Sequence, residues 1–134
     1  MKIEVSNGEI VDKLTILEIK LENSTDVEKT NSIQKELSYL KPIVDEFDIP
    51  ESLIDSLREV NKKLWDIEDS LRICESKFQF DDDFIQLARL VYYTNDKRFE
   101  LKKQINKITN SYLSEEKIHY SYKYKELNLS KIYT

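Results

Sequence analysis

Glycine and proline are scarce in this sequence, which has one glycine and two prolines among its 134 residues. An all-β fold needs a turn about every 8–12 residues, and turns rely heavily on these two residue types. Leucine, isoleucine, lysine and glutamate are instead abundant, as is typical of proteins built from long helices. The composition therefore predicts an all-α fold, in one domain that spans residues 1–134.

Disulfides, long apolar runs and excess positive charge are missing as well. The single cysteine, Cys74, excludes an internal disulfide, so a cytoplasmic location is the default expectation. No apolar run approaches the ~20 residues of a membrane-spanning helix, and the first residues lack the apolar stretch of a signal peptide. The net charge of −5 lacks the basic excess that nucleic acids select. We therefore expect neither nucleic acid nor a membrane as a partner.

Residue sets for metal binding or nucleophilic catalysis are also missing. Glu116 and His119 form an E-x-x-H pair, but helical di-iron sites use two such pairs and His119 is the only histidine. One cysteine and one histidine are too few for a structural zinc site. There is no glycine-rich phosphate loop and no Ser/His/Asp set. We expect no metal and no cofactor, and the sequence identifies no catalytic residue.

The first predicted helix runs from about residue 7 to residue 22. Ser6 and Glu9 form the S-x-x-E pattern of a capping box at its start. Apolar residues recur at helical spacing along one seam, namely Ile10, Leu14, Leu17 and Leu21. Further apolar residues lie off that seam, namely Val11, Ile16 and Ile19. A helix that is apolar on several sides is expected to lie centrally, with neighbours around it.

The sequence marks the starts of the second and third helices with capping residues and prolines. Thr25 and Glu28 form another capping box at the start of the second helix. At Pro42 we expect a kink or a restart, because proline disfavours helical backbone at the residue before it. Pro50 is typical of the first turn of the helix that follows.

The third helix carries the most regular pattern in the sequence. Its apolar residues repeat at alternating spacings of four and three, namely Leu53, Leu57, Val60, Leu64, Ile67, Leu71, Cys74 and Phe78. Such a heptad seam predicts long antiparallel neighbours that pack at a shallow angle. Because Cys74 belongs to this seam, we interpret it as a small core residue and not as a nucleophile.

After an acidic run, a fourth helix is predicted from about residue 83 to residue 113. Residues 114–134 lose helical spacing. Apolar and aromatic side chains alternate there, namely Ile118, Tyr120, Tyr122 and Tyr124, which is typical of an extended segment. This tail would lie across the helices or pair with residues 3–5. The predicted architecture is an antiparallel four-helix bundle, or a pair of long helical hairpins, with a short extended C-terminal tail.

Polar residues interrupt the apolar stripe of the fourth helix. The stripe is apolar from Phe84 to Val91 and again at Ile105, but the positions between are Asn95, Arg98 and Lys102. Burying such charges unpaired costs several kcal/mol each. Either they meet carboxylates, or they line a wet cavity, or the helix breaks near Asn95 and a new one is capped there.

A second polar row lies on the third helix, one position beyond its apolar seam. It contains Asn61, Trp65, Glu68, Arg72 and Glu75, and the first helix adds Lys13 and Glu18. An antiparallel arrangement would bring these rows together as a polar cluster. One interpretation is a self-satisfied network of ion pairs that fixes helix register. The other is a pocket for a carboxylate or phosphate group between the helices.

In the pocket interpretation, three cations donate hydrogen bonds to the anionic group, two polar residues orient them, and the tryptophan forms a wall. The donors are Arg72, Arg98 and Lys102, the orienting residues are Glu68 and Asn95, and the wall is Trp65. The candidate ligand-binding residues are therefore Lys13, Trp65, Glu68, Arg72, Asn95, Arg98 and Lys102.

Four segments carry a family resemblance: GEIVDKLTILEIKLE, LWDIEDSLRICE, FIQLARLVYYTNDKRFELKKQIN and EEKIHY. Together they resemble a family of small uncharacterised bacterial and phage proteins, a domain of unknown function whose members open with a similar segment. The resemblance covers most of the chain. It implies a link to surface-polysaccharide or glycan synthesis, and it brings no catalytic residue with it.

These observations favour a non-catalytic cytoplasmic binding or accessory protein with a polar patch between helices that suits an anionic group. Two alternatives stay open. One is a small enzyme that acts on a phosphorylated or carboxylated metabolite and uses the same cations to stabilise developing charge. The other is a helical scaffold that forms a homodimer through its long third helix. A protein partner is compatible with the first and third of these functions.

Overall fold

The structure, a computed structural model, describes residues 1–122. These residues form four α-helices and no strand: α1 (Asn7–Asn23), α2 (Val27–Glu46), α3 (Glu51–Ser76) and α4 (Asp82–Ile108). The predicted all-α fold is confirmed, and each of the four predicted helices is present. None of the helices in this part of the chain is long and apolar enough to cross a membrane.

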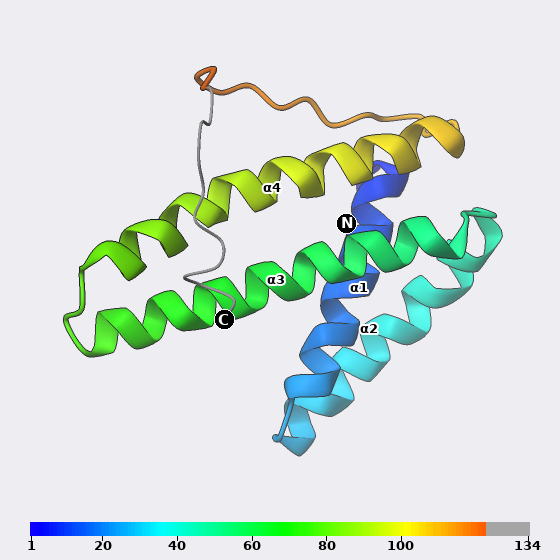
Figure 1. The fold of residues 1–134 in the computed structure, drawn as a ribbon. Coiled ribbons are helices and arrows are strands. Elements are labelled where there is room, and N and C mark those ends of the chain that lie inside the picture. Colours follow the sequence, from blue (N-terminus) through cyan, green and yellow to red (C-terminus); the bar gives the residue numbers. More distant parts are fainter. Residues whose placement is uncertain (123–134) are drawn as a thin grey trace.

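Two antiparallel helical hairpins, α1–α2 and α3–α4, cross each other steeply (Figure 1). α1 packs against each of the other three helices, which confirms that the first helix is central. α3 and α4 lie side by side along their length (Figure 1), as the heptad seam predicts. Of the two predicted arrangements, the pair of long hairpins describes the structure.

Apolar side chains form two core clusters. The first lies around the crossing of α1 and contains Val11, Leu14, Val44, Ile54, Leu57 and Ile105. The second lies between α3 and α4 and contains Ile67, Cys74, Leu87 and Leu90. Cys74 is thus a core residue, as predicted. Phe78 is not, because α3 ends at Ser76 and the backbone at Phe78 adopts a φ of 51°, which leaves this side chain 84% exposed.

The caps of the first two helices are built from side chains. The Ser6 hydroxyl accepts a hydrogen bond from the Glu9 amide at 3.3 Å, as the capping pattern predicts. At α2 the predicted cap is wrong by one residue, since Asp26 and not Thr25 is the N-cap. The Asp26 carboxylate accepts hydrogen bonds from two amides of the first turn. A carboxylate also favours the positive end of the helix dipole, which a hydroxyl does not.

The two prolines lie inside α2 and at the start of α3. α2 runs through Pro42 as one helix, so of the two predicted outcomes, a kink or a restart, the restart is wrong. Proline removes one backbone donor, and the burial of Val44 beyond it in the first core cluster holds the last turn in place. Pro50 is the N-cap of α3, whose first residue is Glu51, so it precedes the first turn and does not belong to it.

α4 is continuous from Asp82 to Ile108, which confirms that the helix does not break near Asn95. It ends before the predicted residue 113, because the chain reverses at Asn110, whose φ is 51°. Residues 112–122, which we call the return segment, then run back along α4 without regular secondary structure (Figure 1). Residues 3–5 form no strand with them. Residues 123–134, which include Tyr124 of the predicted alternation, lie outside the described residues.

The only glycine of the sequence lies where α1 touches the end of α4. The Gly8 amide donates a 2.6 Å hydrogen bond to the Asn106 side-chain oxygen, and the Asn7 amide donates to the Ser111 hydroxyl at 2.9 Å. A Cβ atom at Gly8 would lie 2.5 Å from the backbone oxygen of Lys102. Only glycine allows this close approach of the two helices.

We expect the Gly8→Ala substitution to lower the free energy of unfolding by roughly 1–3 kcal/mol, because the new Cβ overpacks against a backbone carbonyl. At an unconstrained helix position the same change stabilises by about 0.5–1 kcal/mol, so the sign of the effect is diagnostic. Denaturation with urea measures it. The exposed α1 variant Lys20→Ala is the control, expected within about 0.5 kcal/mol of wild type. A Gly8→Ala protein as stable as wild type contradicts the close approach.

Candidate functional site

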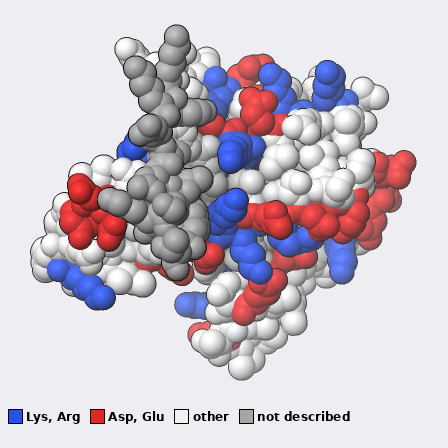
Figure 2. Space-filling view, viewed as in Figure 1, with Lys and Arg blue, Asp and Glu red and all other residues white. Residues whose placement is uncertain are grey.

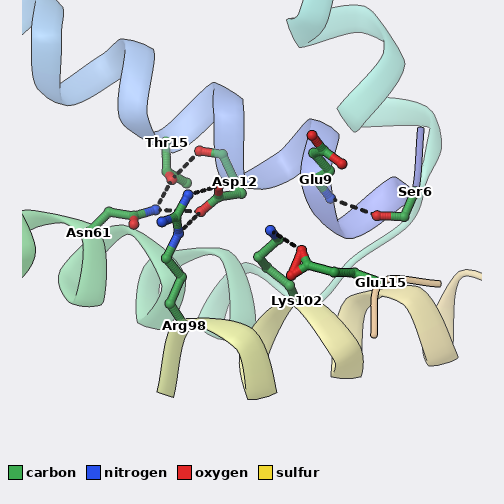
Figure 3. Close-up of polar contacts among 8 residues, drawn as sticks. All are labelled: Ser6, Glu9, Asp12, Thr15, Asn61, Arg98, Lys102 and Glu115. Atoms are coloured by element: carbon green, nitrogen blue, oxygen red, sulfur yellow. Dashed lines mark hydrogen bonds and ion pairs between the residues drawn. The ribbon is translucent and has the colours of Figure 1, made fainter. Parts of the chain in front are cut away.

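The Arg98 side chain of α4 reaches across to α1 and forms a two-point ion pair with Asp12 (Figure 3). Its Nε donates to Asp12 Oδ1 at 2.9 Å and its Nη2 donates to Asp12 Oδ2 at 2.5 Å. Asp12 is buried. The hydrogen bond to Asp12 raises the pKa of Arg98 above its ordinary value, and it outweighs the opposing effect of burial. Arg98, one of the two cations on the inward stripe of α4, therefore pairs with a carboxylate.

The other polar atoms around Asp12 join three helices. The Asn61 amide of α3 donates to Asp12 Oδ1 at 2.9 Å and to the Thr15 hydroxyl at 2.8 Å. The Thr15 hydroxyl in turn donates to the backbone oxygen of Asp12 at 2.8 Å. Asp12, Thr15 and Asn61 are all buried. A buried polar group is tolerated when its hydrogen bonds are made, and this network makes them within α1, α3 and α4.

Lys102 lies one turn beyond Arg98 on α4 and pairs with Glu115 of the return segment (Figure 3). Lys102 Nζ lies 2.7 Å from Glu115 Oε2. Farther along, Lys117 Nζ lies 3.0 Å from Asp96 Oδ1, and the Tyr122 hydroxyl donates to Asp96 Oδ2. Ion pairs and a hydrogen bond thus join the return segment to α4 at two points, Lys102 and Asp96, and the Tyr122 ring also contacts Tyr92 and Tyr93.

Asp96 is the acceptor at the second of these points. Partial burial acts to raise the pKa of Asp96, but the hydrogen bonds from Tyr122 and Lys117 and the charge of Lys117 outweigh it. The net effect lowers the pKa of Asp96 below its ordinary value. Asp96 is therefore held in its charged form beside the return segment. His119 approaches the same carboxylate, with Nε2 at 4.0 Å.

A cavity of about 840 Å³ lies between α4 and the return segment. Basic residues on its lining are Arg89, Arg98, Lys102 and Lys117, and acidic residues are Asp96 and Glu115. Aromatic residues on its lining are Tyr92, Tyr93, Phe99, Tyr120 and Tyr122, and His119 and Asn95 complete it. The lining therefore carries more basic than acidic residues, and several aromatic ones, in a protein whose net charge is −5. On the face seen in Figure 2, acidic side chains form a band toward the right and a cluster at the left, and basic side chains lie at the top and near the centre.

Three of the seven predicted site residues line this cavity, namely Asn95, Arg98 and Lys102. Lys13, Trp65, Glu68 and Arg72 are not on its lining. Lys13 pairs with Glu36 in solvent, and Arg72, 72% exposed, pairs with Glu68 and Asp69 of its own helix. Of the predicted rows, Asn61 of α3 joins Arg98 of α4 through Asp12. The crossing of α1 presents Asp12 to Arg98, where Lys13 and Glu18 were expected. Glu68 acts on Arg98 only through its charge, which helps to raise the Arg98 pKa.

The sequence analysis did not predict several residues of the site. Asp12 and Thr15 lie on the buried side of α1, three residues apart, and a polar pair within an apolar helix is a signal that could have been read. Glu115 and Lys117 gave no usable signal, because their partners depend on the reversal at Asn110. No group of three His, Cys, Asp or Glu within residues 1–122 is arranged to hold a metal ion.

The fold and the site define an all-α protein of crossed helical hairpins, with a charged and aromatic cavity under a C-terminal return segment. The chain belongs to a family of unknown function, DUF6165, whose family model matches residues 1–125. The resemblance to a domain of unknown function is thereby confirmed. Comparison with curated proteins and with solved structures found no match.

We expect Asp12→Asn to lower the free energy of unfolding by roughly 2–4 kcal/mol, because it leaves the Arg98 guanidinium without its carboxylate in a partly buried place. Chemical denaturation measures the loss. The neighbouring variant Lys13→Ala is the matched control, since it breaks an exposed pair worth about 0–1 kcal/mol. Equal effects of the two substitutions would contradict the importance of the Asp12–Arg98 pair.

The lowered pKa of Asp96 makes its contribution to stability depend on pH. A carboxyl whose folded-state pKa is depressed stabilises the fold above its unfolded pKa, ordinarily 3.8, and the effect is lost as pH falls through the lower folded pKa. The stability advantage of wild type over Asp96→Asn should therefore be present at about pH 5–7 and should shrink below about pH 4. Denaturation at each pH tests this. An advantage that persists unchanged to acid pH refutes it, and Asp69→Asn on the exposed face of α3 is the control.

Proposed function

We propose that this protein is a non-catalytic cytoplasmic binding or accessory protein whose cavity takes a small molecule with a carboxylate or phosphate group. The supporting observation is the excess of basic over acidic residues on the cavity lining, four against two, in an acidic chain. Ligand sites commonly combine an apolar or aromatic lining with a few convergent polar groups. The cavity between α4 and the return segment has that composition.

Arg98 is suited to anion binding because its orientation is already fixed. Among the described residues, the hydrogen-bond partner of Arg98 is Asp12. Arg98 donates to it from Nε and Nη2 only. The Nη1 side of the guanidinium remains for an oxygen of a ligand in the cavity that Arg98 lines. A donor held in place by the fold loses little conformational freedom on binding, which strengthens the interaction.

The aromatic part of the lining suggests what else the ligand carries. Tyr92 and Phe99 come from α4, and Tyr120 and Tyr122 come from the return segment. Flat aromatic faces pack against sugar and base rings. The Asn95 amide and the Asp96 carboxylate lie on the same lining and can bond hydroxyl groups. A ring that carries hydroxyls and an acidic group therefore fits the cavity, and sugar phosphates, nucleotide sugars and uronic acids have this chemistry.

This ligand class agrees with the link to surface-glycan synthesis that the family resemblance implies. We therefore also propose that the protein serves surface-glycan synthesis. An accessory function would consist of holding such a compound for another protein. The heptad seam of α3 is covered by α1 and α4, so a homodimer through that seam is a less favoured alternative. Turnover of a bound compound would instead support the small-enzyme alternative.

A thermal-shift screen tests the proposal. Glucose 1-phosphate, UDP-glucose and glucuronate should each be tried, with uncharged glucose as the negative control. A ligand at about 100 times its Kd stabilises by roughly 2.7 kcal/mol, which raises Tm by several degrees in a domain of this size. No Tm increase with any acidic compound would refute the proposal.

Two substitutions locate the binding site. Lys102→Met keeps most of the side-chain volume and removes a cation of the cavity, so the Tm increase should disappear. Arg72→Gln removes an equal charge from the exposed face of α3, away from the cavity, so the Tm increase should persist. Loss of binding in Arg72→Gln, together with binding in Lys102→Met, would favour the four predicted residues that the cavity does not include.

A further inference from the structure

The most enclosed cation of the cavity already has an anionic partner from the protein itself. Lys102 is 10% exposed at its side chain, compared with 30% for Arg98 and for Lys117. Its partner Glu115 is 38% exposed and belongs to the return segment. A glutamate carboxylate oxygen therefore lies 2.7 Å from the ammonium group to which an acidic ligand would bind.

The part of the return segment around Glu115 is attached to α4 only lightly. Residues 112–116 make no backbone hydrogen bond to a helix, and the polar contact that joins them to α4 is the Glu115–Lys102 ion pair. From Lys117 on, the segment is held by the contacts to Asp96, by the Lys117 ammonium over the Phe99 ring and by the Tyr122 ring against Tyr92 and Tyr93. Large side chains of the segment, including Ile118 and Tyr120, are exposed. A segment with few buried contacts and no backbone hydrogen bonds to its support opens at low free-energy cost.

The base of the return segment is, in contrast, held firmly. The Ser111 amide donates to the backbone oxygen of Asn106 at 2.9 Å, and the Ser111 hydroxyl accepts from the Asn7 amide at 2.9 Å. Movement of the segment therefore begins after Ser111, and Glu115 lies a few residues beyond this fixed point. A short tether of this kind gives its carboxylate a local concentration on the order of millimolar at Lys102.

From these contacts we infer that the Glu115 carboxylate occupies the position of the ligand's anionic group, so that the ligand binds by displacing Glu115, with its neighbours in residues 112–116, from Lys102. This inference rests on the proposed function and adds to it. Glu115 acts as an internal competitor for Lys102. The apparent affinity for an external carboxylate or phosphate is lowered in proportion to the fraction of molecules in which Glu115 is paired with Lys102. The form in which Glu115 has left Lys102 is then the form that binds.

The test compares two neighbouring substitutions of equal charge. Glu115→Gln removes the competing carboxylate, whereas Glu116→Gln removes a charge from the adjacent residue, for which no ion pair occurs among residues 1–122. Calorimetric titration with glucuronate and with glucose 6-phosphate gives Kd for each protein. Glu115→Gln should bind more tightly by roughly three- to tenfold, and Glu116→Gln should match wild type. The two compounds separate a carboxylate preference from a phosphate preference.

Limited trypsin digestion gives an independent measure of displacement. Lys117 lies in the return segment and pairs with Asp96, so cleavage after Lys117 reports opening, and cleavage after Lys2, outside any helix, normalises the rate. Glu115→Gln should be cleaved faster after Lys117 than Glu116→Gln without ligand. Saturating glucuronate or glucose 6-phosphate should also accelerate this cleavage in wild type.

The outcomes separate this inference from the proposed function. If wild type binds an acidic compound and Glu115→Gln binds it equally or more weakly, the inference is wrong and the proposed function stands. Protection of Lys117 by the bound compound likewise refutes displacement, because the segment would then close over the ligand. If neither wild type nor Glu115→Gln binds either compound, both are wrong.

Discussion

The ion pair between Asp12 and Arg98 is the contact on which the rest of the site depends. It joins α1 to α4 at the point where the two hairpins cross, and Asn61 of α3 completes it. A buried carboxylate without a cation would be costly, and so would a half-buried guanidinium without an anion. Each therefore fixes the other, and Arg98 is held as a wall of the cavity in one orientation.

The close contact at Gly8 sets the second constraint. Because α1 has no side chain there, its first turn can lie against the backbone of Lys102 and bond the end of α4 through Asn106. The same contact holds Ser111, from which the chain turns back over α4. The place of Glu115 on Lys102 follows from this geometry. Helix packing, cavity and return segment are thus consequences of one junction between the first and last helices.

Sequence periodicity correctly placed cations on the inward face of α4, but it identified their partners only in part. The spacing along α4 showed that Arg98 and Lys102 face the interior, and both meet carboxylates in the structure. Of the expected row on α3, Asn61 joins the Asp12–Arg98 network, whereas Arg72 and Glu68 remain on the exposed face of that helix. Periodicity defines which face of a helix is apolar, but it does not give the crossing angle at which another helix meets that face.

The sequence by itself determined the helical class, the four helices and the inward direction of the cations of α4, since each of these follows from local composition and spacing. Only the tertiary structure decided that Asp12 would be the partner of Arg98, that Gly8 would permit the close contact, and that Glu115 would return to Lys102. These pairings join residues distant in the chain. Their geometry depends on the steep crossing of two hairpins and on a left-handed turn at Asn110, and neither is encoded in the spacing along any one helix.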